Sequence, residues 1–148
     1  MEESYKESPS VCRFNIRVYG IVINSKNEIL LCREHFNGHS FVKFPGGGLE
    51  YGEGTHDCLH REFKEELDLA IEINEHIYTT DFFQQSAFFP TDQVIAIYYK
   101  VTLKNEIVDP YFTSNDLKID FFWKSLTQLT EHDLSLPIDQ VMVKKLLF

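Results

Sequence analysis

One segment of the chain combines a glycine run with closely spaced acids and an arginine. At about 100° per residue, a helix through Glu62, Glu65 and Glu66 places all three carboxylates within an arc of roughly 100°. Hard oxygen ligands gathered in this way suit Mg²⁺ or Mn²⁺. An acidic helix taken alone is more often a solvated face that binds nothing. The glycine run, together with Glu53 and Arg61 at fixed distances, favours a metal site instead.

The helix that would carry these acids has its own positioning signals. Leu59, Phe63 and Leu67 fall on one apolar stripe, so one side can be buried while the adjoining side holds the carboxylates. Thr55 is a suitable N-cap, and Asp57 suits the first turn. The glycines before the helix permit a sharp bend, because glycine adopts positive φ angles at little steric cost. We therefore expect a loop that leads into a half-buried helix.

The spacing of these residues resembles the Nudix box, the signature of the Nudix hydrolase family. The segment reads Gly47, five residues, Glu53, seven residues, Arg61-Glu62-Phe63, one residue, Glu65-Glu66, one residue, Asp68-Leu69. It departs from the family pattern at Asp68, where the family has a glycine that ends the helix in a left-handed conformation. Aspartate tolerates that conformation better than most residues. No metal-binding carboxylate is lost by this departure.

The resemblance assigns roles to five charged residues of the box and to the backbone of Gly46. The expected ligands of Mg²⁺ or Mn²⁺ are Glu62, Glu65, Glu66 and the backbone carbonyl of Gly46. Arg61 would pair with an acid and fix the loop to the helix, and Glu53 would act with it to orient the ligands. The general base in the family is a box glutamate or an acid from a later loop, and we predict Glu65. The catalytic residues expected from the resemblance are Glu65, Glu62, Arg61 and Glu53.

Residues outside the box could complete the site. Asp116 and Asp120 are candidates for a further metal ligand or the base, although such residues are more often ordinary loop or strand-edge acids. Lys43, Arg33 and Arg17 could hold substrate phosphates, although cations at strand ends are more often only solvated. A platform for a nucleotide base could come from one of the aromatic residues Phe82, Phe83, Phe88, Phe89 and Tyr98, most of which would ordinarily be core residues.

The elements around the box are mainly strands. Strands are expected at 14–23, 28–33, 41–44, 71–83, 94–103 and 119–124. The first two would form a hairpin over the turn at 24–27, and residues 34–40 would be a polar loop. A short helix beginning at 126–131 and a final helix at 137–148 are expected, with a turn-rich segment at 104–116. This pattern indicates an α/β (α+β) layered domain. The resemblance implies a Nudix-like mixed β-sheet sandwiched between α-helices.

Composition excludes several classes of protein. A chain of 148 residues, 43% hydrophobic, is one packed domain by size; residues 1–10 would be a flexible N-terminus and 11–148 a single Nudix hydrolase domain. The net charge of -9 argues against non-specific nucleic-acid binding, which needs a basic surface. No apolar run could span a membrane, and no signal peptide is evident. Three widely spaced cysteines without a zinc pattern indicate reduced thiols, as in a cytoplasmic protein.

The expected function is metal-dependent cleavage of a pyrophosphate linkage in a nucleoside diphosphate linked to another group. In the family, ADP-ribose hydrolases tend to carry a proline in the region of residues 82–86, and dinucleoside polyphosphate hydrolases a tyrosine just beyond; this chain has neither. A nucleoside triphosphate or nucleotide sugar is therefore the predicted substrate, with the other two classes as alternatives. A non-catalytic nucleotide-sensing Nudix domain and a structural protein with an acidic helix stay open. A homodimer is plausible by family habit.

Overall fold

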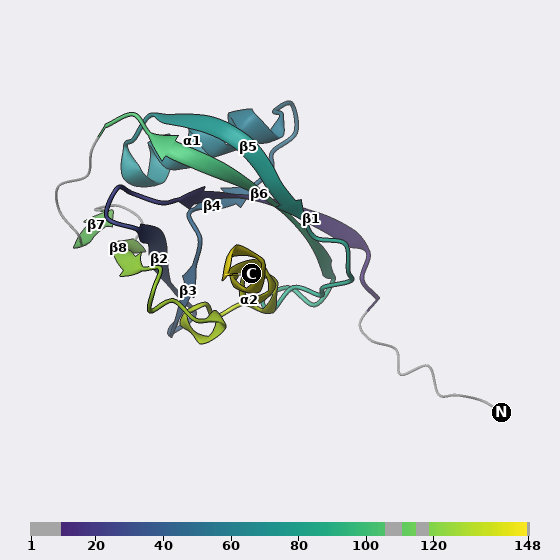
Figure 1. Ribbon diagram of the computed structural model, residues 1–148. Coiled ribbons are helices and arrows are strands. Elements are labelled where there is room, and N and C mark those ends of the chain that lie inside the picture. Colours follow the sequence, from purple (N-terminus) through teal and green to yellow (C-terminus); the bar gives the residue numbers. More distant parts are fainter. Residues whose placement is uncertain (1–9, 106–110, 115–118, 148) are drawn as a thin grey trace.

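The computed structural model describes residues 10–105, 111–114 and 119–147, which form two four-stranded sheets and two α-helices (Figure 1). The first sheet has the order β4 (Gly46–Gly48), β1 (Arg13–Val22), β6 (Asp92–Leu103), β5 (Ile71–Thr79). The second has the order β3 (His39–Lys43), β2 (Glu28–Phe36), β8 (Ile119–Ser125), β7 (Tyr111–Ser114). Helix α1 spans Thr55–Leu67, a 3₁₀ turn spans Glu131–Asp133, and α2 spans Pro137–Leu147. The expected mixed α/β fold class is confirmed, and most of the predicted flexible tail lies outside the described residues.

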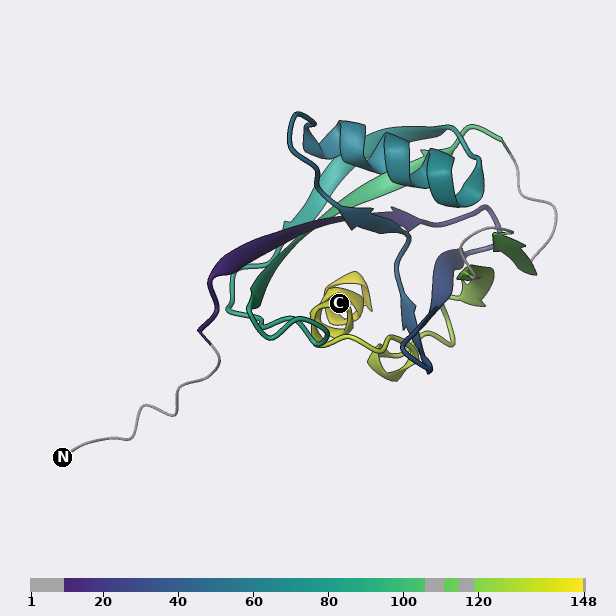
Figure 2. The same ribbon diagram turned by 180° about the vertical axis from the view of Figure 1, so that it is seen from behind.

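Strand β1 is one of the two inner strands of the first sheet, parallel to β6 and antiparallel to β4. Its side chains alternate between two cores, because successive residues of a strand point to opposite faces. Val18 and Val22 pack in the cluster that contains α1, whereas Tyr19 and Ile21 pack in the cluster that contains α2. The two helices therefore cover opposite faces of this sheet, as Figures 1 and 2 show from both sides.

The predicted hairpin of the first two strands is wrong. Beyond an isolated bridge between Ile23 and Ile29, β1 and β2 separate into different sheets. Strand β1 instead pairs with β4 at one edge and β6 at the other, and its two apolar faces are covered by α1 and α2. The predicted polar loop at 34–40 is also wrong, because β2 and β3 form a hairpin there. Its turn is Asn37-Gly38, with positive φ angles of 49° and 75°.

Other boundaries differ in smaller ways. Strand β5 ends at Thr79, and its register shifts between Ile73 and Glu75, close to the predicted break. Strand β7 forms inside the segment predicted to be turn-rich, where no strand was expected. The short helix predicted from residue 126 is absent from this part of the described chain, where a 3₁₀ turn begins only at Glu131. Within the described residues, no helix is both long and apolar enough to cross a membrane.

Candidate active site

Both ends of α1 are fixed by local contacts. The N-cap is Gly54, whose N–H donates to Asp57 Oδ2 at 2.9 Å; the predicted cap, Thr55, is instead the first helical residue. At the other end Asp68 has φ 54° and ψ 39°, and its N–H donates to the Lys64 carbonyl at 3.1 Å. Asp68 thus adopts the left-handed conformation expected of the glycine it replaces. The helix ends correctly without that glycine.

The apolar stripe of α1 holds the helix against the first sheet. Leu59 and Phe63 are fully buried, and Leu67 packs at the edge of the same cluster. A Cβ on Gly20 of β1 would lie 2.9 Å from two ring carbons of Phe63, so the strand and the helix are in close contact there. This burial confirms the predicted stripe and turns the adjoining acidic side of α1 toward β4.

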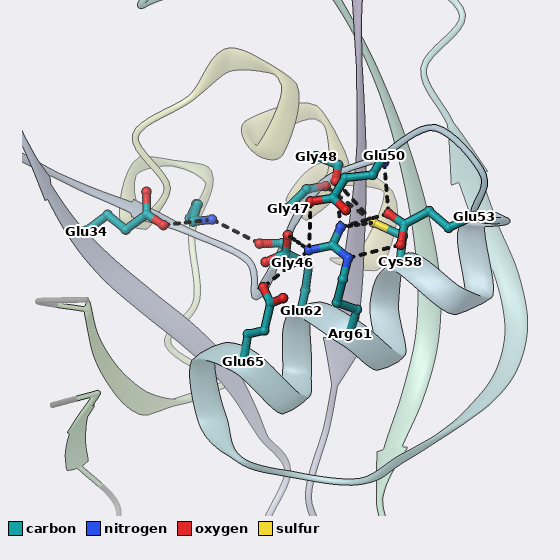
Figure 3. A network of polar contacts seen from close by, with 11 residues as sticks. Glu34, Gly46, Gly47, Gly48, Glu50, Glu53, Cys58, Arg61, Glu62 and Glu65 are labelled. Atoms are coloured by element: carbon teal, nitrogen blue, oxygen red, sulfur yellow. Dashed lines mark hydrogen bonds and ion pairs between the residues drawn. The ribbon is translucent and has the colours of Figure 1, made fainter. Parts of the chain in front are cut away.

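Arg61 connects the loop before α1 to the acids on the helix (Figure 3). Its Nε and Nη2 donate to the two carboxylate oxygens of Glu53 at 3.0 and 2.7 Å, and Nη2 also donates to the Gly48 carbonyl at 3.0 Å. Its Nη1 lies 2.9 Å from Glu62 Oε1 and 3.3 Å from Glu65 Oε2. Hydrogen bonding to Arg61 lowers the pKa of Glu53 to about 2. These are the contacts expected of a residue pair that orients neighbouring ligands.

The glycine run lets β4 approach the helix closely. A Cβ on Gly47 would overlap the carboxyl group of Glu62, which is itself only 9% exposed. A Cβ on Gly46, where φ is 147°, would overlap the carbonyl of Val18 on β1. The backbone of β4 therefore fixes the Glu62 carboxylate on one side, and Arg61 fixes it on the other.

Glu66 is poorly satisfied by the protein. Its Oε2 is buried and has no hydrogen-bond partner in the described part of the chain. Burial raises the pKa of Glu66, and the neighbouring Glu62 carboxylate raises it further, while Lys43 opposes both effects. An unpaired buried oxygen next to a second carboxylate is costly unless a cation joins them.

These donors fit a hard divalent cation such as Mg²⁺ or Mn²⁺, which prefers carboxylate oxygens. Among the residues that the structure describes, no three His, Cys, Asp or Glu side chains already form a metal site. Glu62 and Glu66 lie together, whereas Glu65 faces Arg61 and is 57% exposed. Turning Glu65 toward an ion would break only an exposed ion pair, which is worth about 0–1 kcal/mol.

Lys43 lies beside this acidic group with its side chain only 2% exposed. Its Nζ is 3.1 Å from Glu34 Oε1 and donates to the Gly46 carbonyl at 3.2 Å. Burial lowers the pKa of Lys43, but electrostatic interactions with Cys32, Tyr19, Glu34 and Glu66, in that order of size, raise it, and the net shift is upward. The ammonium is therefore charged at neutral pH and bridges β2 to β4.

A cleft of about 250 Å³ adjoins the acids. Its aromatic lining comes from β1, β2, β3 and the segment before β6: Tyr19, Phe36, Phe41, Phe88 and Phe89. Its polar lining includes Asn15, Gln84, Gln85 and Ser86. Arg17 and Lys43 line the cleft and also interact with acids of the box, Arg17 with Glu62 and Lys43 with Glu66. The cleft and the acidic site therefore share these two cations.

Other predicted site residues lie elsewhere. The Arg33 guanidinium lies 5.1 Å from the centre of the Phe122 ring, and Arg33 does not line the cleft. Asp120 Oδ2 is 3.6 Å from His35 Nε2 on the neighbouring strand. Asp116 lies outside the described residues. The structure thus joins Arg17 and Lys43 to the box, but not Arg33.

Only some of the aromatic residues predicted to stack on a nucleotide base line the cleft. Phe88 and Phe89 line the cleft, whereas Phe82 and Phe83 do not. Tyr98 is buried in the core, where its hydroxyl donates to Asp139 Oδ1 at 2.6 Å.

Sequence reasoning missed Glu34, although the Asn-Gly pair at the β2–β3 turn could have revealed it. A two-residue turn there pairs Cys32 with Lys43 and brings Glu34 to the same face.

Comparison with known proteins supports the resemblance seen in the box. The family model of the NUDIX domain matches residues 13–146. A Nudix hydrolase from Nitrosomonas europaea has a TM-score of 0.72 and 17% identity, over 90% of this chain and 88% of that one. The MutT protein from Methanosarcina mazei Go1 has a TM-score of 0.69 and 22% identity, over 90% and 92%. An ADP-ribose pyrophosphatase from Streptococcus suis 89-1591 has a TM-score of 0.61 and 20% identity, over 89% and 86%.

At these identities the solved structures show a shared fold, and the family match over residues 13–146 shows the family. The chain belongs to the Nudix family of pyrophosphohydrolase enzymes.

Proposed function

We propose that this protein cleaves the P–O–P linkage of a nucleoside diphosphate joined to another group, with a nucleoside triphosphate or a nucleotide sugar as substrate. The observation that carries the proposal is the buried, unpaired Oε2 of Glu66 next to Glu62, at the edge of an aromatic cleft. A cation is needed at the acids, and the aromatic walls suit the flat face of a nucleotide base. Arg17 lines the cleft and interacts with Glu62, so it would contact the phosphates that link the base in the cleft to the cation at the acids.

The residues of the box would have three roles: metal binding, positioning of the ligands, and general-base catalysis. Glu62, Glu65 and Glu66 would hold Mg²⁺ or Mn²⁺, which when bound neutralises phosphate charge and lowers the pKa of a bound water. Arg61 and Glu53 keep Glu62 in place through the hydrogen bonds described above. Glu65 is the proposed general base, because its exposed carboxylate is accessible to water.

Three further expectations stay predictions: a cytoplasmic location, a homodimer, and no binding of nucleic acid. The acidic net charge of -9 supports the last of these, because polyanions would be repelled. No described contact identifies a dimer interface.

The proposal is tested by product analysis after incubation with nucleoside triphosphates, nucleotide sugars, ADP-ribose and dinucleoside polyphosphates. We expect metal-dependent formation of a nucleoside monophosphate from one of the first two classes. Turnover confined to ADP-ribose or dinucleoside polyphosphates would overturn the substrate assignment. Tight nucleotide binding without turnover would indicate a sensing domain.

A further inference from the structure

A buried cation already occupies part of the acidic site. The Lys43 ammonium contacts Glu34 and the Gly46 carbonyl, and it lies 5.8 Å from the centre of the Tyr19 ring. A charge this deeply buried persists only when it is paired and hydrogen-bonded. Here the partners include the backbone oxygen that the family resemblance assigns to the metal.

The same carbonyl cannot readily serve both cations. Mg²⁺ binds oxygen at about 2.1 Å, and the Gly46 oxygen is 3.2 Å from Lys43 Nζ. An ion on that oxygen would therefore lie within about 5.3 Å of the ammonium. A divalent and a monovalent cation at such a separation repel strongly even at an effective dielectric constant of about 20. The carboxylates of α1 offer negative oxygens to an ion that need not share the Gly46 carbonyl with the ammonium.

Lys43 is also a poor ligand for substrate phosphate. Its side chain is 2% exposed, and its ammonium already contacts two oxygens. Arg17 lines the same cleft, and its interactions with acids include Glu62 of the box. The phosphate-binding role expected of Lys43 is thus better placed on Arg17.

We propose that Lys43 is a positioning residue that supplies a permanent internal cation: it occupies the Gly46 carbonyl and offsets Glu66, and it leaves divalent ions to the carboxylates of α1. This inference rests on the proposed metal dependence, and it departs from the family expectation for Gly46. Glu34 is the carboxylate partner of this ammonium, with its Oε1 3.1 Å from Lys43 Nζ. In this arrangement Lys43 lowers the affinity for the metal while it holds β4 in register with the acids.

The test is a titration of the protein with Mn²⁺ in the absence of substrate. The electron paramagnetic resonance signal of free Mn²⁺ measures how much of the ion stays unbound. Lys43→Met removes the charge from a side chain of similar shape and frees the Gly46 carbonyl. We expect its Kd for Mn²⁺ to fall by at least about tenfold, because the repulsion from the ammonium is gone. Lys26→Met is the matched control, since it removes one charge from an exposed residue in the β1–β2 turn. Its Kd should stay that of the wild type.

Glu34→Gln gives a second, opposite readout. It leaves the ammonium without its carboxylate partner, so Mn²⁺ should bind more weakly than in the wild type. If Lys43→Met does not fold, Glu34→Gln alone tests the inference. We expect Glu34→Gln to fold, because the Glu34 side chain is 24% exposed and water can solvate the new amide.

An unchanged or higher Kd in folded Lys43→Met would overturn the inference, and so would an unchanged Kd in Glu34→Gln if only that variant folds. If the wild type binds Mn²⁺ and Lys43→Met binds it no more tightly, the inference about Lys43 fails but the proposed function stands. A wild type that binds no Mn²⁺, while Lys43→Met binds it, supports the inference and contradicts the native metal dependence. Absence of binding in both proteins overturns both.

Discussion

Replacing Gly47 with alanine tests the position of the Glu62 carboxylate directly. The new methyl group would overlap the carboxyl of Glu62, a residue that is only 9% exposed and is held on its other side by Arg61 Nη1 at 2.9 Å. Either β4 or Glu62 must therefore move. Overpacking of this kind costs about 1–3 kcal/mol. In a chain of this size, that corresponds to a melting temperature lower by roughly 2–12 °C.

Turnover should suffer more than stability in Gly47→Ala. A shift of about 1 Å at a ligand can lower the rate on the order of a hundredfold. Thermal unfolding and phosphate release from the same preparation measure the two effects separately. Gly54→Ala is the control from the same loop: its Cβ would meet only Asp57 Oδ2, at 3.4 Å, so it should lose about 1 kcal/mol or less as a poorer cap and keep its turnover. Wild-type stability and turnover in Gly47→Ala would refute the close approach of β4 to Glu62.

Further variants address other parts of the site and core. Glu66→Gln should keep the fold, because the amide removes repulsion from Glu62, and should lower Mg²⁺-dependent phosphate release by orders of magnitude; an unchanged rate would exclude Glu66 as a ligand. Glu53→Gln should reduce turnover less than Glu66→Gln, and the reverse order would mean that their roles are exchanged. The pKa of Glu53 is about 2 in the fold against an ordinary value of 4.5, so its pair with Arg61 stabilises the protein above about pH 4.5 and is lost as pH falls toward 2. Denaturant unfolding should therefore show Glu53→Gln less stable than the wild type at pH 7 and equally stable near pH 2; a gap that widens in acid would contradict this. Phe63→Ala should lower the free energy of unfolding by about 3–5 kcal/mol, because the ring is fully buried, and a loss below 1 kcal/mol in the same measurement would contradict its packing.

The parts of the site that sequence could predict are local in the chain. The stripe of Leu59 and Phe63 follows from helix periodicity alone, and their burial agrees with it. The left-handed Asp68 follows from its place at the end of the box helix, and its φ of 54° agrees with it. Contacts within one helix and its loop depend on spacing, which the sequence states directly.

The parts that sequence missed depend on which strands pair. The hairpin of β1 and β2 is predicted from their proximity in the chain, but the edges of β1 pair with β4 and β6, which lie farther along the chain. The cleft joins β1, β2, β3, the segment before β6 and the start of α2, which are far apart in sequence. The buried contact between Lys43 and Glu34 depends on the register of β2 and β3. The sequence alone does not show that Glu34 is the partner of the Lys43 ammonium, because that contact depends on how β2 pairs with β3.

The central claim is that the acids of α1 support metal-dependent cleavage of a pyrophosphate linkage. The most direct measurement is phosphate-bearing product released from the substrate panel with Mg²⁺, with Mn²⁺ and with a chelator, by folded wild-type protein. We predict release that requires the metal, is confined to nucleoside triphosphates or nucleotide sugars, and is abolished by the chelator. Release that persists in chelator, or no release from any substrate by folded protein with Mn²⁺ bound, would contradict the claim.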